Sequence, residues 1–199
     1  MAAEFSRSYG GTVDPGQVAI TQGCNQAFCA TITTLARAGD QVILPTPWYF
    51  NHKMWLDMQG IAAVPLPTGP ALIPDPARAA ALITPRTRAI VLITPNNPSG
   101  ASYPRELLEK IVAIAVKHNL LLMVDEIYDQ ILYDDAVFQP VAPLAGGDDP
   151  CAIVHRHDER WYTAGGLYAP QIADGDPSDA TVWTEILPAV ELKGNSHHY

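Results

Sequence analysis

Short, mainly apolar runs alternate with longer segments of helical spacing through the first two thirds of the chain. Such runs, bounded by turn residues, are typical of strands buried in a sheet. We expect strands at 18–21, 41–44, 62–66, 89–93 and 120–124. The last two runs contain no polar residue, which is typical of parallel strands covered on both faces.

Helices are expected between these runs. The clearest begins near Pro104, because apolar residues then recur at three- and four-residue intervals up to His118. Further helices are expected at 25–38, at 48–58 and in a short segment that ends at Leu82. This alternation predicts an α/β fold with three layers, α/β/α, around a mostly parallel sheet.

The sequence changes in character at about Pro150. Segments containing Gly and Pro interrupt every candidate periodic stretch, and no helix or strand is predicted there. Four of the six histidines also lie in this part of the chain. The sequence therefore divides into a domain of residues 1–149 and an irregular C-terminal tail of residues 150–199.

Composition and charge narrow the functional classes. With 199 residues, 48% of them hydrophobic, the chain can form one globular domain. A net charge of -9 gives no attraction to nucleic acid or to an anionic membrane. We expect neither a leader peptide nor a membrane-spanning segment, because the sequence shows no basic segment followed by an apolar run and no apolar run of spanning length. Three cysteines are too few for a disulfide framework. We expect a cytoplasmic protein without nucleic-acid or membrane partners.

The loop after the fourth predicted strand is a candidate binding element. In an open parallel sheet, ligands bind beyond the carboxyl ends of the strands. Residues 94–100 occupy such a position, and Asn97 could donate a hydrogen bond to a ligand oxygen. The alternative is an ordinary turn rich in Asn, Pro and Gly.

A carboxylate and a phenol follow the fifth predicted strand. Asp125 comes directly after the apolar run, and Tyr128 lies three residues later. A partly buried carboxylate needs a partner, and the protonated ring nitrogen of a pyridine cofactor is a suitable one. The alternative is that Asp125 caps a following helix.

Two earlier strand ends complete the set. Gly23 lies in a turn before a predicted helix, where the amides of Cys24 and Asn25 could bind an anion such as phosphate. After the next strand, the aromatic side chain of Tyr49 could stack on a flat ring. The alternatives are an ordinary helix start and ordinary core packing.

In this order, the four features resemble the class I/II aminotransferases, which are fold-type I enzymes dependent on pyridoxal 5′-phosphate (PLP). The loop at 94–100 matches the family pattern Asn-Pro-x-Asn-Pro-Thr/Ser-Gly, except that Thr94 replaces the first Asn. The resemblance covers about residues 9–149, a central fragment of the family's PLP-binding large domain. It implies a role for six residues: Cys24 and Asn25 at the phosphate, Tyr49 on the ring face, Asn97 and Tyr128 at the phenolic oxygen, and Asp125 at the pyridine nitrogen.

The lysine that bonds covalently to PLP in this family is missing from its expected place. No lysine occurs between Lys117 and Lys193, and arginine cannot substitute because a guanidinium stays protonated. Lys193 lies in the tail and is not expected to take this role, so no catalytic residue is assigned. Our hypothesis is that a frameshift near Asp149 replaced the family's continuation with out-of-frame sequence.

The resemblance implies an enzyme that transfers an amino group between an amino acid and a 2-oxo acid, and that forms a homodimer. The alternatives are a non-catalytic remnant, a PLP-binding pseudoenzyme, or another fold-type I enzyme such as a carbon-sulfur lyase. No metal site is expected, because the spacing from Cys151 to His157 matches no zinc pattern. Cys24 lacks a histidine nearby in the sequence to act as its base, and His52 and His118 are interpreted as structural or surface residues.

Overall fold

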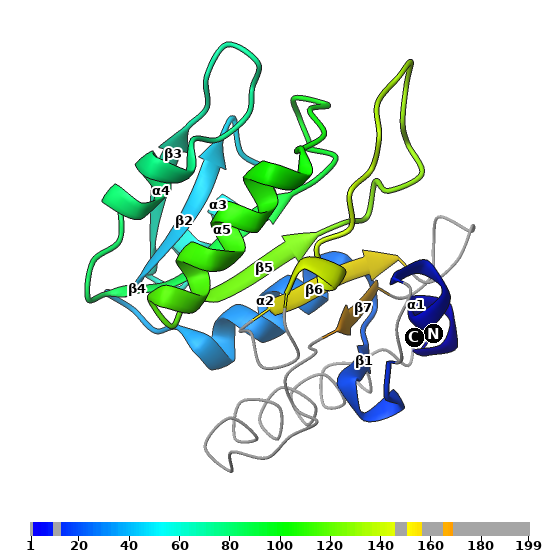
Figure 1. Cartoon of the computed structure of the whole chain (residues 1–199). Coiled ribbons are helices and arrows are strands. Elements are labelled where there is room, and N and C mark those ends of the chain that lie inside the picture. Colours follow the sequence, from blue (N-terminus) through cyan, green and yellow to red (C-terminus); the bar gives the residue numbers. More distant parts are fainter. Residues whose placement is uncertain (1, 10–12, 146–150, 157–164, 169–199) are drawn as a thin grey trace.

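A seven-stranded sheet forms the centre of the computed structural model, which describes residues 2–9, 13–145, 151–156 and 165–168 (Figure 1). The strands are β1 (Val18–Ile20), β2 (Gln41–Thr46), β3 (Ala62–Pro67), β4 (Thr87–Ile93), β5 (Leu121–Asp125), β6 (Cys151–Arg156) and β7 (Gly165–Tyr168). Their order across the sheet is β1-β7-β6-β5-β4-β2-β3. Neighbouring strands from β6 to β3 run parallel, whereas β7 is antiparallel to both of its neighbours.

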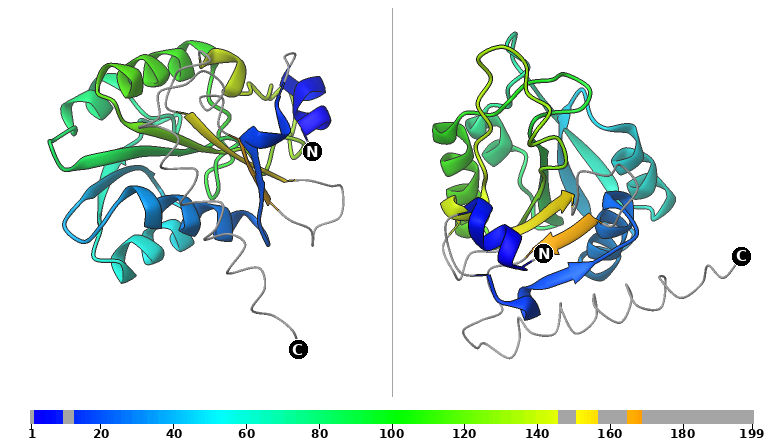
Figure 2. Two further views of the ribbon diagram at one scale, coloured as in Figure 1. Left: turned by 90° about the horizontal axis from the view of Figure 1, so that it is seen from below. Right: turned by 90° about the vertical axis from the view of Figure 1, so that its right-hand side faces the viewer.

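Helices cover both faces of this sheet, as the left-hand view of Figure 2 shows. One face carries α4 (Pro76–Ala81) and α5 (Arg105–Lys117), and the other carries α2 (Cys24–Leu35) and α3 (Phe50–Met58). The remaining helical elements are α1 (Ala2–Tyr9) and the 3-10 turns η1 (Pro15–Gln17) and η2 (Ala142–Leu144). The predicted three-layer α/β/α fold with a mostly parallel sheet is confirmed.

Alternate residues of β4 enter two separate cores. Ile90 and Leu92 pack in the core that contains Leu108 of α5, whereas Val91 packs in the core that contains Phe28 of α2. Each of these side chains is at most 2% exposed. Because successive side chains of a strand point to opposite faces, a strand between two helical layers must be apolar at every position.

The five predicted strands and four predicted helices all occur, with ends that differ by a few residues. Helix α2 stops at Leu35 because Ala36 adopts an extended conformation, with φ -133° and ψ 151°. Helix α1 was not predicted from the sequence. Phe5 anchors it, since this side chain is 2% exposed and belongs to the same core as α5.

The expectation that no regular structure follows Pro150 is wrong. Residues 151–156 form β6, which pairs in parallel with β5, and residues 165–168 form β7, which pairs with both β6 and β1. Ile153 of β6 is fully buried in the core. These segments gain strand structure from the sheet neighbours that they pair with, and a local sequence pattern does not reveal such neighbours. The rest of the predicted tail, including Lys193, lies outside the described residues.

Candidate functional site

A cavity of about 100 Å³ lies at the rim where the carboxyl ends of β4 and β5 meet. Its lining comprises Cys24, Asn25, Tyr49, Ile93, Asp125, Ile127 and Tyr128. Five of the six residues predicted from the sequence therefore line one cavity, although they come from separate elements. The sixth, Asn97, is hydrogen-bonded to Tyr128.

The turn before α2 directs the first turn of this helix at the cavity. Gly23 adopts φ 86° and ψ 163°, a conformation that is essentially restricted to glycine. Thr21 stabilises the turn, because its Oγ1 donates to the Gly23 carbonyl oxygen at 2.9 Å. An α-helix leaves the amides of its first turn without intrahelical acceptors, so the end at Cys24 and Asn25 can bind an anion.

Cys24 belongs to the lining of the cavity. Burial, with a smaller contribution from the negative charge of Asp125, raises the pKa of this thiol to about 12. The thiolate is the reactive form of cysteine. At neutral pH the side chain is therefore a neutral lining group, which agrees with the sequence argument against a nucleophilic Cys24.

Asp125 is held at the end of β5 by contacts on both sides. Its carbonyl oxygen accepts from the Thr94 N–H at 3.0 Å, and its side-chain Oδ1 accepts from the Ile127 N–H at 3.1 Å. The residue is 6% exposed, so its carboxylate is largely removed from water. Residues 126–141 contain no α-helix, and the alternative role of Asp125 as a helix cap is therefore wrong.

His52 is a site residue that the sequence analysis did not find. Its Nε2 lies 3.8 Å from Asp125 Oδ2, and its ring stacks on Phe28 with centroids 3.9 Å apart. Burial lowers the pKa of this imidazole to about 4, so it is neutral at pH 7. The structural interpretation of His52 was incomplete, because the ring both packs in the core and faces the carboxylate. The spacing of three residues from Tyr49 was the available signal, since residues i and i+3 of a helix share a face.

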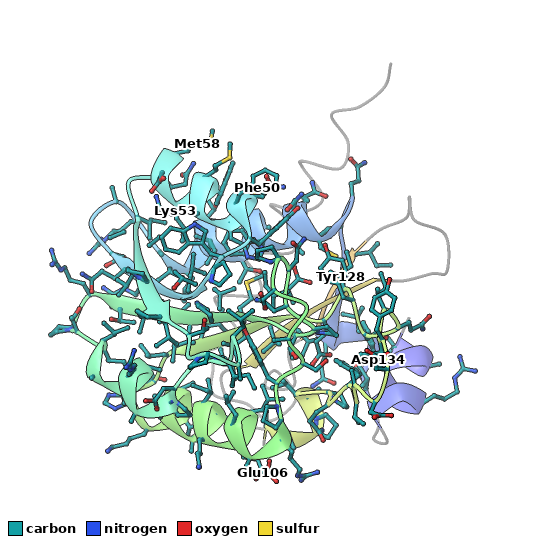
Figure 3. All side chains as sticks on the ribbon, turned by 90° about the horizontal axis from the view of Figure 1, so that it is seen from above. Phe50, Lys53, Met58, Glu106, Tyr128 and Asp134 are labelled. Atoms are coloured by element: carbon teal, nitrogen blue, oxygen red, sulfur yellow. The ribbon has the colours of Figure 1, made fainter. Side chains whose placement is uncertain are left out.

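The two aromatic residues at the start of α3 lie in different environments. Tyr49 lines the cavity, and its ring meets His52 edge-on at a centroid distance of 5.2 Å. The Asn51 Nδ2 donates to the Tyr49 hydroxyl at 2.9 Å and so fixes the ring. Phe50, the next residue along, is 61% exposed and lies on the outer side of α3 (Figure 3).

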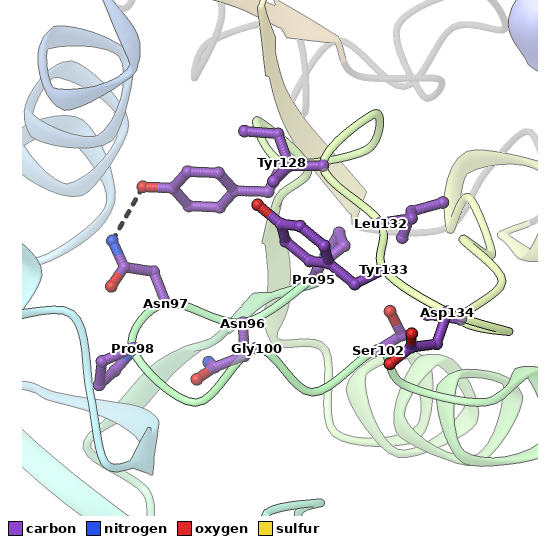
Figure 4. Close-up of a pocket in the computed structure, with 12 residues that line it drawn as sticks. Pro95, Asn96, Asn97, Pro98, Gly100, Ser102, Tyr128, Leu132, Tyr133 and Asp134 are labelled. Atoms are coloured by element: carbon purple, nitrogen blue, oxygen red, sulfur yellow. Dashed lines mark hydrogen bonds between the residues drawn. The ribbon is translucent and has the colours of Figure 1, made fainter.

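Asn97 and Tyr128 form a polar pair beside the cavity. The Asn97 Nδ2 donates to the Tyr128 hydroxyl at 2.8 Å, as the dashed line in Figure 4 shows. Burial raises the pKa of the Tyr128 phenol, against the opposite effect of the Asn97 hydrogen bond. The phenol is therefore protonated at neutral pH and can donate to a ligand oxygen while it accepts from Asn97. Both residues also line a second, larger cavity of about 430 Å³ (Figure 4).

Asn96, the residue before Asn97, stabilises the turn at residues 94–100, as the alternative interpretation of this loop expected. Asn96 Oδ1 accepts from the Ser99 N–H at 3.2 Å and from the Ser99 hydroxyl at 2.7 Å. Asn96 thus stabilises the turn, and Asn97 bonds to Tyr128. Both interpretations of the loop therefore apply, each to a different asparagine.

No lysine of the described residues lines the cavity. Lys53 pairs with Asp57 on the surface of α3, and Lys110 and Lys117 belong to α5 on the opposite face of the sheet. Among the described residues, no group of three His, Cys, Asp or Glu side chains is placed to hold a metal ion. Within the same residues, no helix has the length and apolar character needed to cross a membrane.

The sequence matches the family model of aminotransferase class I and II over residues 1–156. This chain belongs to that family. The match includes the six predicted site residues and extends the resemblance found from the motifs by a few residues at each end. Class I and II aminotransferases depend on PLP.

Individual relatives agree with this assignment. The aspartate/prephenate aminotransferase of Thermus thermophilus is 38% identical over 147 residues, which cover 72% of this chain and 38% of that protein. The glutamate-pyruvate aminotransferase AlaA of Escherichia coli is 43% identical over 136 residues, which cover 63% of this chain and 32% of that protein. The chain therefore spans less than two fifths of the length of these relatives.

Solved structures show the same fold. A tetra mutant of the Thermus thermophilus aspartate aminotransferase superposes with a TM-score of 0.84 and 29% identity, over 98% of this chain and 52% of that chain. The alanine aminotransferase of Pyrococcus furiosus gives a TM-score of 0.87 and 25% identity, over 96% of this chain and 49% of that chain.

The residues of the cavity fit the chemistry of PLP, apart from the lysine. A helix N-terminus suits the phosphate, the buried carboxylate of Asp125 suits a protonated ring nitrogen, and the Tyr128 hydroxyl suits a phenolic oxygen. These three groups surround one cavity, so one molecule can reach all of them. A covalent attachment point is absent from the described lining.

Proposed function

We propose that this chain binds PLP in the cavity and forms the cofactor-binding part of an aminotransferase. The proposal is carried by one observation, which is the assembly of an anion-binding helix end, a buried carboxylate and a phenol around the same cavity. The family to which the chain belongs uses this cofactor.

Each residue has a stated task in this proposal. The amides of Cys24 and Asn25 hold the phosphate, and the ring of Tyr49 covers one face of the pyridine. Asn97 and Tyr128 hold the phenolic oxygen. The Asp125 carboxylate keeps the ring nitrogen protonated, and the neutral ring of His52 shields that carboxylate from water.

The proposed reaction is transfer of an amino group between an amino acid and a 2-oxo acid. When bound, PLP supplies a ring that withdraws electrons from the substrate carbon, and a protonated ring nitrogen strengthens this effect. Proton movement at the substrate carbon needs an amine that the described cavity does not provide. We infer that residues beyond the described ones supply this amine and the substrate-binding groups. We further propose that a second subunit completes the active site and that the protein works in the cytoplasm.

Cofactor binding and covalent attachment are tested separately. Pyridoxamine 5′-phosphate cannot condense with a lysine, so quenching of tryptophan fluorescence by this compound measures non-covalent binding. We expect saturable binding that inorganic phosphate weakens by competition. An absence of saturation by both pyridoxamine 5′-phosphate and PLP would falsify the proposal.

A second function is favoured by the absence of a lysine from the described lining, namely a pseudoenzyme that holds PLP without reacting. Borohydride reduction after incubation with PLP, followed by peptide mass spectrometry, decides between the two. A stoichiometric adduct on one lysine together with transamination of an amino acid supports the enzyme. Saturable binding with neither result supports the pseudoenzyme, and release of a thiol or carbon dioxide indicates another fold-type I reaction.

The division of the chain at Asp149 and the out-of-frame origin of residues 150–199 stay predictions. They are tested by translating the coding DNA beyond Asp149 in the other two frames. We expect a Ser-x-Ser-Lys-like segment in one of them. If neither frame encodes such a segment, the frameshift hypothesis is wrong.

A further inference from the structure

Glu126 is a buried carboxylate that the proposed cofactor contacts do not use. It follows Asp125 directly and is 0% exposed. Its Oε1 accepts from the Val141 N–H at 2.8 Å, across 15 positions of sequence. A buried carboxylate is costly unless hydrogen bonds compensate it, and the bond from Val141 supplies part of this compensation while it links two segments that are distant in the sequence.

The bond closes a long loop that carries Tyr128. Residues 127–140 contain neither an α-helix nor a strand. Two local backbone bonds stabilise turns within this loop, from the Ile131 N–H to the Tyr128 carbonyl oxygen at 2.8 Å and from the Ala136 N–H to the Tyr133 carbonyl oxygen at 3.1 Å. Two of its side chains, Tyr133 and Val137, are each 77% exposed. Few buried contacts therefore hold the loop between its ends.

The far end of the loop is anchored in the core. Val141 is 0% exposed and belongs to the core that includes Leu108 of α5. Its carbonyl oxygen accepts from the Leu144 N–H at 2.8 Å, which begins η2. Glu126 thus joins the end of β5 to a fixed point beneath α5.

We propose that Glu126 is a positioning residue for the cofactor site, which sets the place of Tyr128 by closing the loop 127–140 onto Val141. The effect on PLP binding rests on the proposed function, whereas the closure of the loop does not. The Tyr128 hydroxyl meets Asn97 (Figure 4) and in the proposed site also meets the phenolic oxygen of PLP. A loop released at Val141 would hold the phenol less firmly in that place.

Closure is measured first, on the chain without any ligand. In Glu126→Ala, hydrogen exchange of the Val141 amide and of loop 127–140 should rise by about tenfold or more, because the buried N–H loses its acceptor. Glu126→Gln retains an acceptor oxygen and should stay near the parent rate. Glu106→Gln is the matched control, since Glu106 is an exposed acid on α5 away from the loop (Figure 3). Glu126→Met fills the same space without an acceptor, and it serves as the test if the alanine variant does not fold.

The action through Tyr128 is measured by a double-mutant cycle on the affinity for pyridoxamine 5′-phosphate. We expect Glu126→Ala to raise the Kd roughly tenfold in the parent chain but much less in a Tyr128→Phe background, because both changes remove the same contact. Glu126→Gln should restore most of the affinity. A merely structural role predicts equal losses in the two backgrounds.

The closure and the action through Tyr128 are contradicted by different results. Unchanged exchange at Val141 in Glu126→Ala and Glu126→Met refutes the closure. Faster exchange with additive losses of affinity refutes the action through Tyr128. If neither the parent chain nor any variant binds pyridoxamine 5′-phosphate or PLP while exchange rises as expected, the proposed function fails and the closure stands.

Discussion

Asp125 and His52 face each other across 3.8 Å in a region from which most water is excluded. At this distance the pair makes no strong hydrogen bond, and the neutral imidazole does not compensate the carboxylate charge. The backbone amide of Ile127 is a partner of Asp125, and a cation on the cavity side would be a further one. This arrangement suits a carboxylate that pairs with a protonated pyridine ring.

Replacement of Asp125 by asparagine tests that role. The amide keeps the size of the side chain but loses the charge, so the affinity for PLP should fall by about 10- to 100-fold, the range of a charged hydrogen bond. Fluorescence titration with PLP and with pyridoxamine 5′-phosphate measures the change. Asp57→Asn, on the exposed side of α3, should leave the affinity unchanged. Equal affinity in both variants would show that Asp125 does not contact the ring nitrogen.

His52 should make folding stability depend on pH. Its pKa of about 4 in the folded chain lies below the ordinary value of 6.5, so the unfolded chain binds the proton first as the pH falls. The contribution of the neutral ring is complete above about pH 6.5 and is lost towards pH 4. Between pH 7.5 and 5.5 the free energy of unfolding should fall by about 1 kcal/mol more in the parent chain than in His52→Gln. Urea denaturation at the two pH values measures this, and identical losses would contradict the shifted pKa.

At the scale of elements, the start of α2 depends on the backbone of Gly23. Its φ of 86° and ψ of 163° place the amides of the first turn at the cavity, and a side chain is strained in this conformation even where there is space for it. The phosphate-binding function of this helix end therefore requires glycine at one position. This is a stronger constraint than the sequence motif suggested, because a single glycine in a turn is common.

Gly23→Ala should destabilise the chain by about 1–3 kcal/mol, the cost of this backbone region for a residue with a Cβ. It should also weaken competition by inorganic phosphate in the binding assay. Gly69→Ala is the matched control, because a Cβ there meets no atom within 4 Å and the backbone is not strained. If both alanine variants unfold at the same denaturant concentration, the geometry at Gly23 is not the limiting feature.

Elements with a strong local signal were predicted from the sequence, and elements that depend on neighbours were not. β4 and β5 were visible because strands covered on both faces must be apolar throughout. β6 and β7 were missed because Gly165–Tyr168 carries no alternating pattern, and its strand conformation comes from pairing with β1 and β6. The same reason explains α1, whose position rests on one buried residue, Phe5.

At the scale of the whole molecule, the site depends on a sheet whose last two strands, β6 and β7, follow Asp149 in the sequence. β1 leads directly into the turn at Gly23, and its partner in the sheet is β7. The first predicted strand is therefore attached through the part of the chain that the sequence analysis set aside as a tail. The boundary at residue 149 does not coincide with the edge of the sheet.

A chain shortened to residues 1–149 tests this dependence. β1 loses its partner, so the turn at Gly23 loses its support and the affinity for pyridoxamine 5′-phosphate should fall at least tenfold. The shortened chain also lacks β6, the parallel neighbour of β5, which adds to the loss of support at Asp125. Helix α5 and strands β2, β3 and β4 retain their contacts with one another, so circular dichroism should still show helical structure. Parent-like affinity in the shortened chain would establish residues 1–149 as an independent cofactor-binding domain.

The sequence by itself determined the layered fold and the residues at four strand ends, because apolar periodicity and turn chemistry are local properties. It also determined that no lysine follows Asp125 at the expected distance. Only the tertiary structure decided that five of those residues share one cavity, that His52 faces Asp125 and that Glu126 closes the loop of Tyr128. These contacts join residues far apart in the chain or depend on burial, and neither property is written in a local pattern.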